Sequence, residues 1–378
     1  MKIIELCLSP DLGGLELYMY RCCRELQSEA QVIPLVCENG RLQQRLQAEG
    51  LKPQVLARKN RALPLLAARS LARLIDEEQV DIIHLHWTKD IPLAAFAKAF
   101  SRRKPMLVST RQMQITRPKR DPYHDFLYRQ IDLNITITEA LADDMRGFLN
   151  PDYAERVVPL YYGVAAPQEF LAADTRQALR DELGIGPSTF LVGLVGRIKH
   201  YKGQHLLVEA AGKALQQGED VAALIVGHAM EEDYLAELKR MVQEHGWQQR
   251  ILFRDFVEQP QRLMQACDVI ALTTVEETFG LVLVEAMRAG VAVIGSDRGG
   301  VPEIIDHEKT GLLFRSTDGE DLYRQLQHLW QDRDFCARLA AAGKEKADRV
   351  FDEARHFSAL RDLLQQRHRA YLSSETSR

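Results

Sequence analysis

Two glutamates, Glu277 and Glu285, stand eight positions apart in the stretch ETFGLVLVEAMRAG, which otherwise reads as buried core. A carboxylate accepts strong hydrogen bonds, so such a pair can hold the hydroxyl groups of a sugar or a ribose. Two carboxylates that flank a sugar can also act as the acid and base of a glycosidase. The structural alternative is one glutamate at a helix start and one on the helix's solvated face.

The residues between the two glutamates predict a short helix. Thr278 is a residue type that caps helix starts, and Gly290 is a residue type that follows helix ends. We therefore expect a helix that begins near Gly280 or Leu281. The backbone N–H groups at 279–281 have no partner within such a helix, and a helix start of this kind attracts phosphate.

Short apolar runs alternate along the chain with longer amphipathic segments, and this alternation predicts parallel sheets covered by helices. The pattern thins at 160–175 and then restarts. We predict an α/β chain of two doubly wound, Rossmann-like domains that face each other across a cleft, where the strands' carboxyl ends bind ligands. The expected boundaries are 1–165 and 175–355, with a C-terminal helix at 356–378 that packs back on the N-terminal domain.

Composition narrows the class of protein. The chain has 378 residues and a net charge of −4, so nothing favours a nucleic acid partner. The first residues, MKIIELCLSPDLGG, read as a strand and its turn rather than a signal peptide, and no apolar run reaches the ~20 residues of a membrane span. The six cysteines form no Cys-x-x-Cys pattern and are read as reduced packing residues, which favours the cytoplasm.

Four segments carry a resemblance to a known family. The pattern Glu277-x7-Glu285, followed by SDRGGVPEII, resembles the signature of the retaining GT-B glycosyltransferases called group 1. The segment VGRIKHYKG at 195–203 has that family's Arg-x4-Lys spacing. DLGGLELYMYRCCREL resembles its N-terminal Gly-Gly-x-Glu loop and helix, and TITEALADDM resembles the segment that ends its first sheet.

The resemblance implies roles for the residues around the two glutamates. Glu285 would hold the ribose hydroxyls of a nucleotide sugar, and Glu277 would contact hydroxyls of the sugar that is transferred. The backbone N–H groups of Phe279, Gly280 and Leu281 would hold the sugar and the diphosphate. Glycine suits the middle position because the ligand must approach the backbone closely.

The family also implies cations for the diphosphate. Arg197 and Lys202 would neutralise the leaving diphosphate without a metal ion. Gly13 and Gly14 would form a loop over the diphosphate and the acceptor, with Glu16 at the start of the following helix. A plain tight turn explains the two glycines equally well.

Two histidines end a predicted strand, and strand alternation sends His84 and His86 to the same face. Relatives often keep a histidine near the sugar phosphate here, so His86 is a catalytic candidate, although core packing is the commoner fate. The next strand departs from the family, with Arg111 and Gln112 where relatives often have histidine. Arg111 is expected to supply positive charge there, toward the acceptor. Tyr162 replaces a usual asparagine, without an expected chemical consequence.

The implied reaction retains the configuration at the sugar and needs no cofactor beyond a UDP- or GDP-linked sugar donor. Gly299 and Gly300 read as a tight turn, which the family places near that donor.

The acceptor is expected to be a glycan or lipid-linked sugar of a cell-surface polysaccharide, and the basic runs 101–105 and 117–130 suggest peripheral contact with the inner membrane face. The rival interpretations are a decayed nucleotide-sugar-binding or regulatory protein and a sugar-nucleotide epimerase.

Overall fold

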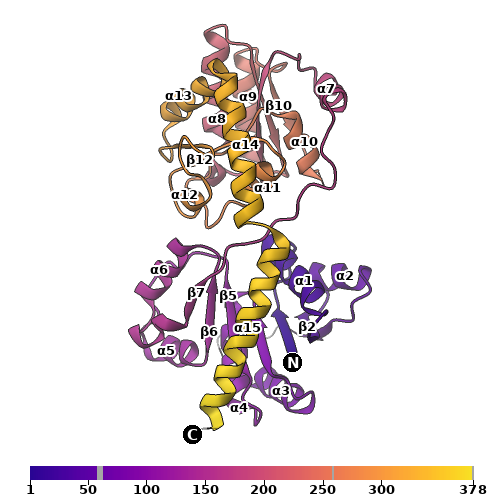
Figure 1. The fold of residues 1–378 in the computed structure, drawn as a ribbon, viewed down its shortest axis with the longest axis vertical. Coiled ribbons are helices and arrows are strands. Elements are labelled where there is room, and N and C mark those ends of the chain that lie inside the picture. Colours follow the sequence, from indigo (N-terminus) through magenta and orange to yellow (C-terminus); the bar gives the residue numbers. More distant parts are fainter. Residues whose placement is uncertain (58–62, 258, 377–378) are drawn as a thin grey trace. The chain divides into compact units, whose positions relative to one another are not determined.

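The chain folds into two compact α/β units in a computed structural model (Figure 1). Unit 1 contains residues 1–161 together with the chain from residue 354 onward, and unit 2 contains residues 162–353. The prediction of two Rossmann-like α/β domains with a helical C-terminal part is confirmed. The structure describes residues 1–57, 63–257 and 259–376.

Unit 1 has, within the described residues, a seven-stranded parallel sheet in the order β3-β2-β1-β4-β5-β6-β7. The inner strands are almost wholly buried, which is why they read as continuous apolar runs in the sequence. The strands are β1 (Lys2–Cys7), β2 (Gln31–Cys37), β3 (Gln54–Leu56), β4 (Ile82–Leu85), β5 (Met106–Arg111), β6 (Leu133–Thr136) and β7 (Val157–Pro159).

The helices of unit 1 follow its strands in the way that parallel crossovers require. They are α1 (Gly14–Leu26), α2 (Arg41–Ala48), α3 (Leu65–Glu77), α4 (Ile91–Phe100), α5 (Pro122–Arg129) and α6 (Glu139–Phe148), with 3₁₀ turns η1 (Thr88–Asp90) and η2 (Pro151–Arg156).

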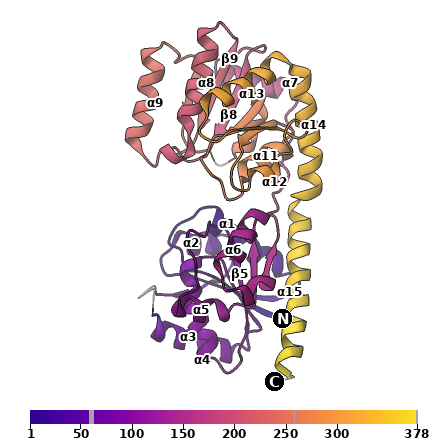
Figure 2. The ribbon, with the colours of Figure 1, turned by 90° about the vertical axis from the view of Figure 1, so that its left-hand side faces the viewer.

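The last helix, α15 (Glu353–Thr376), runs along unit 1 (Figure 2). The Tyr18 hydroxyl lies 2.9 Å from Nε2 of His356, and the Tyr18 ring stacks on Phe357. Further along the helix, the Tyr371 hydroxyl donates to the Lys104 carbonyl at 2.9 Å. These contacts fix the helix to residues that precede it by several hundred positions.

His356 couples the stability of unit 1 to pH. Its Nδ1 donates to the Tyr161 carbonyl at 2.7 Å, so Nε2 is the acceptor for the Tyr18 hydroxyl. Burial lowers the pKa of His356 to about 4, and the nearby Arg21 and His84 act in the same direction. An unfolded histidine has the higher pKa, about 6.5, so the unfolded chain takes up the proton first as the pH falls. Stability is therefore complete above pH ~6.5 and is lost as the pH falls toward 4.

We expect protonation of this histidine in the unfolded chain to lower the free energy of unfolding by about 2 kcal/mol when the pH falls from 7 to 5. Urea unfolding at both pH values measures the loss in the wild type and in His356→Gln, which should lose correspondingly less. His245→Gln removes an exposed histidine of unit 2 and should follow the wild type. An unchanged pH dependence in His356→Gln would contradict this assignment.

Unit 2 has, over the residues that the structure describes, a six-stranded parallel sheet in the order β10-β9-β8-β11-β12-β13. The chain winds outward from β8 in one direction and then returns to the other side of β8, which creates a switch point between β8 and β11. The strands are β8 (Phe190–Val195), β9 (Val221–Val226), β10 (Ile251–Arg254), β11 (Val269–Leu272), β12 (Ala292–Ser296) and β13 (Leu312–Phe314).

The helices of unit 2 alternate with its strands until β13, after which two helices follow each other. They are α7 (Ala173–Glu182), the 3₁₀ turn η3 (His200–Lys202), α8 (Gln204–Gln216), α9 (Glu232–Glu244), α10 (Pro260–Ala266), α11 (Leu281–Arg288), α12 (Val301–Ile304), α13 (Gly319–Gln331) and α14 (Arg333–Val350).

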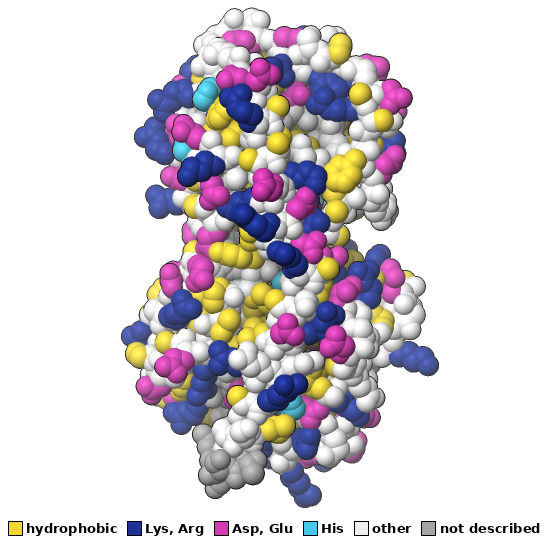
Figure 3. Space-filling view, viewed as in Figure 1, with side chains coloured by type: hydrophobic (Ala, Val, Ile, Leu, Met, Phe, Trp, Pro, Cys, Tyr) yellow, Lys and Arg dark blue, Asp and Glu magenta, His cyan; other side chains and the backbone are white. Residues whose placement is uncertain are grey.

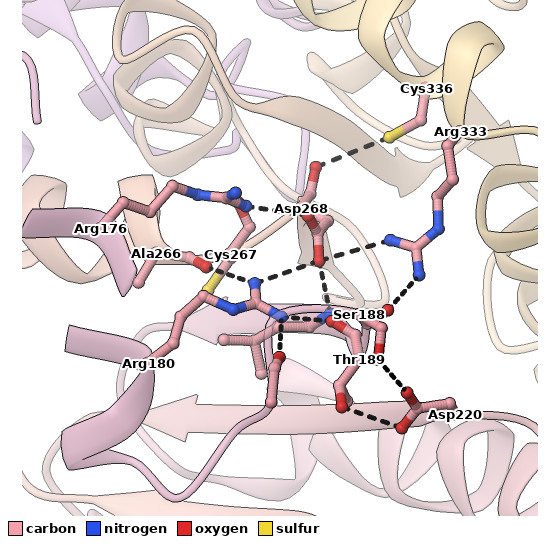
Figure 4. A network of polar contacts seen from close by, with 12 residues as sticks. Arg176, Arg180, Ser188, Thr189, Asp220, Ala266, Cys267, Asp268, Arg333 and Cys336 are labelled. Atoms are coloured by element: carbon pink, nitrogen blue, oxygen red, sulfur yellow. Dashed lines mark hydrogen bonds and ion pairs between the residues drawn. The ribbon is translucent and has the colours of Figure 1, made fainter. Parts of the chain in front are cut away.

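A polar network anchors helices at the amino ends of the unit 2 strands (Figure 4). The carboxylate of Asp268, just before β11, accepts from the backbone N–H of Leu191 in β8 at 2.7 Å. It also accepts from Arg176 of α7 at 2.8 Å. Arg180 of the same helix is buried and donates to the Ala266 carbonyl at 3.0 Å. Because a buried guanidinium needs partners for its donors, this network fixes α7 against the sheet edge.

The structure departs from the predicted elements in two ways. The strands β3, β7 and β13 were not predicted; each has only three residues, too few to show a period in the sequence. Thr278 was predicted to cap the helix between the glutamates, but the residue at the N-cap of α11 is Gly280.

The distribution of surface charge and the apolar character of the helices are relevant to contact with a membrane. On the face in Figure 3, Lys and Arg side chains are interspersed with Asp and Glu rather than gathered in one area. No helix among the described residues combines the length and the apolar character that crossing a membrane requires.

Candidate functional site

Three loops of unit 2 meet at the carboxyl ends of adjacent strands. Since β8, β11 and β12 are neighbours, the loops that follow them share one edge of the sheet. The loop after β8 carries Arg197 and Lys202, and the loop after β11 carries Glu277. The loop after β12 carries Gly299 and Gly300. This edge includes the switch point, where sheets of this type bind ligands.

Lys202 and Glu277 form an ion pair. The ammonium Nζ donates to the carboxylate Oε2 at 2.6 Å, and about a quarter of each side chain is exposed, 22% and 24%. The sequence predicted both residues for the site but did not predict that they contact each other. The pair places a cation and an anion side by side, where a ligand can still reach both.

Hydrogen bonds between the loops hold this pair in place. The Tyr201 hydroxyl donates to the Glu276 carbonyl at 2.7 Å, and the Thr273 hydroxyl donates to the Lys202 carbonyl at 2.8 Å. The backbone N–H of Val275 donates to the Tyr201 carbonyl at 3.2 Å. Partial burial raises the pKa of Tyr201, and the nearby carboxylates of Glu276 and Glu277 raise it further, so its hydroxyl remains a donor.

The glycine pair after β12 supports the backbone of Glu277. The N–H of Gly300 donates to the Glu277 carbonyl at 2.8 Å. Gly299 has φ +63°, and a Cβ placed on it would lie 2.1 Å from the same carbonyl oxygen. Only glycine fits both conditions. The sequence interpretation of a tight turn was incomplete, because this turn also positions a predicted site residue.

Helix α11 begins at the same edge. Gly280, with φ +108°, turns the chain into the helix at Leu281. Phe279 is buried and makes edge contacts with the rings of Tyr162 and Phe351, so only its backbone is available to a ligand. Glu285 is half-buried on the second turn of the helix. In the first turn the N–H of Leu283 donates to the Gly280 carbonyl at 2.9 Å, and the role of the N–H groups at 279–281 stays a prediction.

Arg197 is exposed in the loop after β8. Its backbone carbonyl accepts from the side-chain amide of Gln204 at 3.0 Å, so the loop is fixed while its guanidinium stays at the surface. Gly203 turns the loop into α8 with φ +69°, and a Cβ there would lie 2.3 Å from the Thr273 carbonyl oxygen. The close packing of these backbones explains the glycine that ends the Arg-x4-Lys segment.

The predicted residues of unit 1 lie at the carboxyl ends of β1, β4 and β5, which are also neighbours. The N–H of Gly13 donates to Oε2 of Glu16 at 2.8 Å, so this buried carboxylate caps the helix start and holds the glycine loop, which is one half of a capping box. Arg111 is buried and donates to the carbonyls of Met113 and Gln114, both at 2.6 Å. Gly14 begins α1 and is exposed. Glu16 and Arg111 thus both stabilise their own loops.

His86 is 1% exposed and lies beside a buried carboxylate. Its Nε2 is 2.5 Å from Oε2 of Glu5, and Nδ1 of His84 is 3.1 Å from the other oxygen. Burial would raise the pKa of Glu5, but the two histidines outweigh it and hold the pKa at about 2. Burial lowers the pKa of His86 to about 4. Glu5 was not singled out in the sequence, where it reads as one polar residue in an apolar strand.

Two family profiles match the chain. The profile described as Glycosyl transferases group 1 matches residues 175–346, and the profile described as Glycosyltransferase Family 4 matches residues 12–165. The chain belongs to the group 1 glycosyltransferases. The first profile covers every loop that contributes to the Lys202–Glu277 site, so the resemblance seen in the sequence is confirmed.

Three curated relatives of this group 1 glycosyltransferase differ in the reactions that their names describe. N-acetyl-alpha-D-glucosaminyl L-malate synthase of Bacillus anthracis is 26% identical, over 76% of this chain and 75% of the relative. D-inositol 3-phosphate glycosyltransferase of Nocardia farcinica is 36% identical, over 43% and 38%. Lipopolysaccharide core biosynthesis mannosyltransferase LpsB of Rhizobium meliloti is 30% identical, over 48% and 54%. The last two matches cover less than two thirds of the relative's length.

A solved structure with the same fold is that of Anabaena Alr3699/HepE in complex with UDP and glucose. It is 23% identical to this group 1 glycosyltransferase, covers 96% of this chain and 99% of its own, and superposes with a TM-score of 0.81. At this identity the likeness establishes the fold, two Rossmann-like units of the GT-B type.

Proposed function

We propose that this group 1 glycosyltransferase moves a sugar from a nucleotide-diphosphate sugar to a hydroxyl group of a glycan or lipid-linked acceptor. The observation that carries the proposal is the Lys202–Glu277 ion pair at the switch point of unit 2. A cation suits the diphosphate, and an adjacent carboxylate suits the hydroxyls of the attached sugar. A structural ion pair alone would not need three converging loops to hold it at a sheet edge where ligands bind.

The remaining site residues complete the proposed donor site. Glu285 accepts from the ribose hydroxyls, and the first-turn N–H groups of α11 hold the diphosphate, where a helix start favours an anion. The exposed guanidinium of Arg197 supplies a second positive charge. These two cations would lie beside the diphosphate while the carboxylates contact hydroxyl groups, and we propose metal-independent transfer.

The proposed reaction breaks the bond between the anomeric carbon and the diphosphate oxygen. The acceptor oxygen bonds to the same carbon on the same face, so the configuration is retained, and its proton passes to a phosphate oxygen. Lys202 and Arg197 stabilise the negative charge that grows on the diphosphate as it leaves. Gly13 and Gly14 form the proposed loop over the diphosphate and the acceptor, and Glu16 and Arg111 shape the loops on the acceptor side. The role of His86 in the reaction stays a prediction.

The names of the relatives support a role in the synthesis of cell-surface polysaccharide. LpsB acts in lipopolysaccharide core biosynthesis by its name, and the solved Anabaena structure contains UDP and glucose. We propose a UDP- or GDP-linked donor and an acceptor of a bacterial cell-surface polysaccharide, used at the cytoplasmic face of the membrane. Of the basic residues predicted for membrane contact, Arg103 pairs with Asp81 at 2.6 Å, and Arg120 donates to the carbonyls of Gly147 and Leu149. These two cations are therefore engaged within unit 1, and a lipid-linked acceptor is a further means by which the chain would reach the membrane.

A thermal-shift screen against UDP, GDP, ADP and their common sugar conjugates tests the donor site. A nucleotide present at 100 times its dissociation constant should stabilise the protein by about 2.7 kcal/mol, and we expect a response to one base only. The responding conjugate is then incubated with the protein to detect release of the nucleoside diphosphate. Binding without release would favour the decayed, regulatory alternative, and no binding by any nucleotide would contradict the proposal.

A further inference from the structure

The core of unit 1 contains a cluster of four side chains that are ligand types for a transition metal. Glu5 of β1, Cys22 of α1, His84 of β4 and His86 just after β4 each offer one ligand atom, and these atoms all lie within 4.8 Å of one another. A tetrahedral zinc ion with bonds of about 2.0 to 2.3 Å would separate its ligand atoms by roughly 3.3 to 3.8 Å. Nε2 of His86 and Oε2 of Glu5, now 2.5 Å apart, would separate by about 1 Å to admit an ion, and the widest pairs would approach by a similar amount.

Charge gives a reason for an ion at this place. Glu5 has no exposed surface, and its carboxylate is contacted by two imidazoles rather than by a Lys or Arg side chain. An imidazole carries a positive charge only when it is protonated, so a permanent cation would stabilise this buried carboxylate at every pH. One dication with this carboxylate, the thiolate of Cys22 and two neutral imidazoles has a net charge of zero.

The two histidines differ in whether their second ring nitrogen has a hydrogen-bond partner. Nε2 of His84 lies 2.7 Å from the hydroxyl of Thr110, which is the outer contact that a metal-binding histidine usually makes. Nδ1 of His86 is buried and has no hydrogen-bond partner in the described structure. Hydrogen bonds alone therefore do not satisfy the cluster.

We propose that Glu5, Cys22, His84 and His86 bind one zinc ion that stabilises unit 1. A ligand set of one thiolate, two imidazoles and one carboxylate suits zinc among the common divalent ions. All four side chains are at most 1% exposed, so the ion has no open side for a substrate, and its role is structural. A structural role for His86 is thus an alternative to the catalytic role that the sequence predicts. Because the site is enclosed, the ion must enter as the chain folds.

The experiment uses the full chain produced without a polyhistidine tag. The protein is unfolded with chelator, refolded with zinc or cobalt, and freed of unbound metal. We expect about one zinc per chain, and with cobalt the near-ultraviolet absorption of a thiolate–cobalt bond. Cys22→Ser should reduce the bound metal at least tenfold and abolish that absorption. Cys23→Ser is the matched control, because Cys23 is equally buried and its thiol contacts Met19 instead.

Two results would overturn the proposal. The first is a refolded wild type that binds neither zinc nor cobalt. The second is equal metal content and absorption in the Cys22 and Cys23 variants, which would place any ion elsewhere. Metal content is measured independently of sugar transfer, so neither result depends on the proposed enzymatic function.

Discussion

Replacing Lys202 with methionine is expected to lower the rate of donor turnover by a factor of about 10² to 10³. Methionine keeps the length of the side chain and removes its charge. In the proposed reaction that charge stabilises the departing diphosphate, so kcat should fall more than the Michaelis constant for the donor rises. Release of nucleoside diphosphate from the donor identified by the thermal-shift screen measures both constants without knowledge of the acceptor.

The partner of this lysine provides the second half of the test. Glu277→Gln should also reduce turnover strongly, because the amide is a weaker acceptor for the sugar hydroxyls and leaves Lys202 without the negative charge of its 2.6 Å partner. Residues in contact do not act independently, so the double variant should lose less than the product of the two single losses. Glu276→Gln is the matched control, since this adjacent glutamate is exposed and contributes its carbonyl to Tyr201.

The assignment of Lys202 and Glu277 would be wrong if both single variants turned over donor within about threefold of the wild type. It would also be wrong if Glu276→Gln were as damaging as Glu277→Gln, because the effect would then come from lost negative charge near the loop rather than from the pair.

Replacing Gly299 with alanine is expected to lower both stability and turnover. The new Cβ would lie 2.1 Å from the Glu277 carbonyl oxygen, on a residue with φ +63°. Backbone must move to relieve this contact, and we expect a cost of about 2 to 4 kcal/mol. For a unit of this size that is a fall in Tm of roughly 5 to 10 °C. The displaced backbone carries the Glu277 carboxylate with it, so turnover should fall as well.

Gly218→Ala separates the two causes of this effect. Gly218 also has a positive φ, +80°, but a Cβ there meets no atom within 4 Å. Backbone strain alone should cost about 1 kcal/mol and leave turnover unchanged. Equal losses of stability in the two variants, with turnover intact in both, would show that the turn at Gly299 does not position Glu277.

Much of the fold was predictable because a parallel strand that is buried on both faces appears in the sequence as a continuous run of apolar residues. Runs such as residues 190–195 and 221–226 are apolar at every position, and each forms a strand of the predicted kind. Short edge strands do not appear as such a run. Strand β13 has three residues, and its pairing with β12 is decided by the packing of the rest of the unit.

The helix between the glutamates shows how local signals can mislead. Thr278 is a better capping residue type than glycine, yet the helix begins after Gly280. The reason is tertiary: Phe279 is buried between Tyr162 and Phe351, and the chain must turn sharply at the next residue, with a positive φ, to enter the helix. A capping preference of about 1 kcal/mol is smaller than the free energy of burying a phenylalanine ring.

The sequence by itself determined the class of fold and the family, because residue types and spacings carry that information directly, and it predicted a set of residues for the donor site. Only the tertiary structure decided which of those residues meet. Lys202 and Glu277 are 75 positions apart, and β9, β10 and β11 lie between them in the chain. They are neighbours because β11 pairs with β8 on the side opposite β9, which brings the two loops to one edge of the sheet. Strand order depends on how the helices pack across the sheet, and no local pattern in the sequence records it.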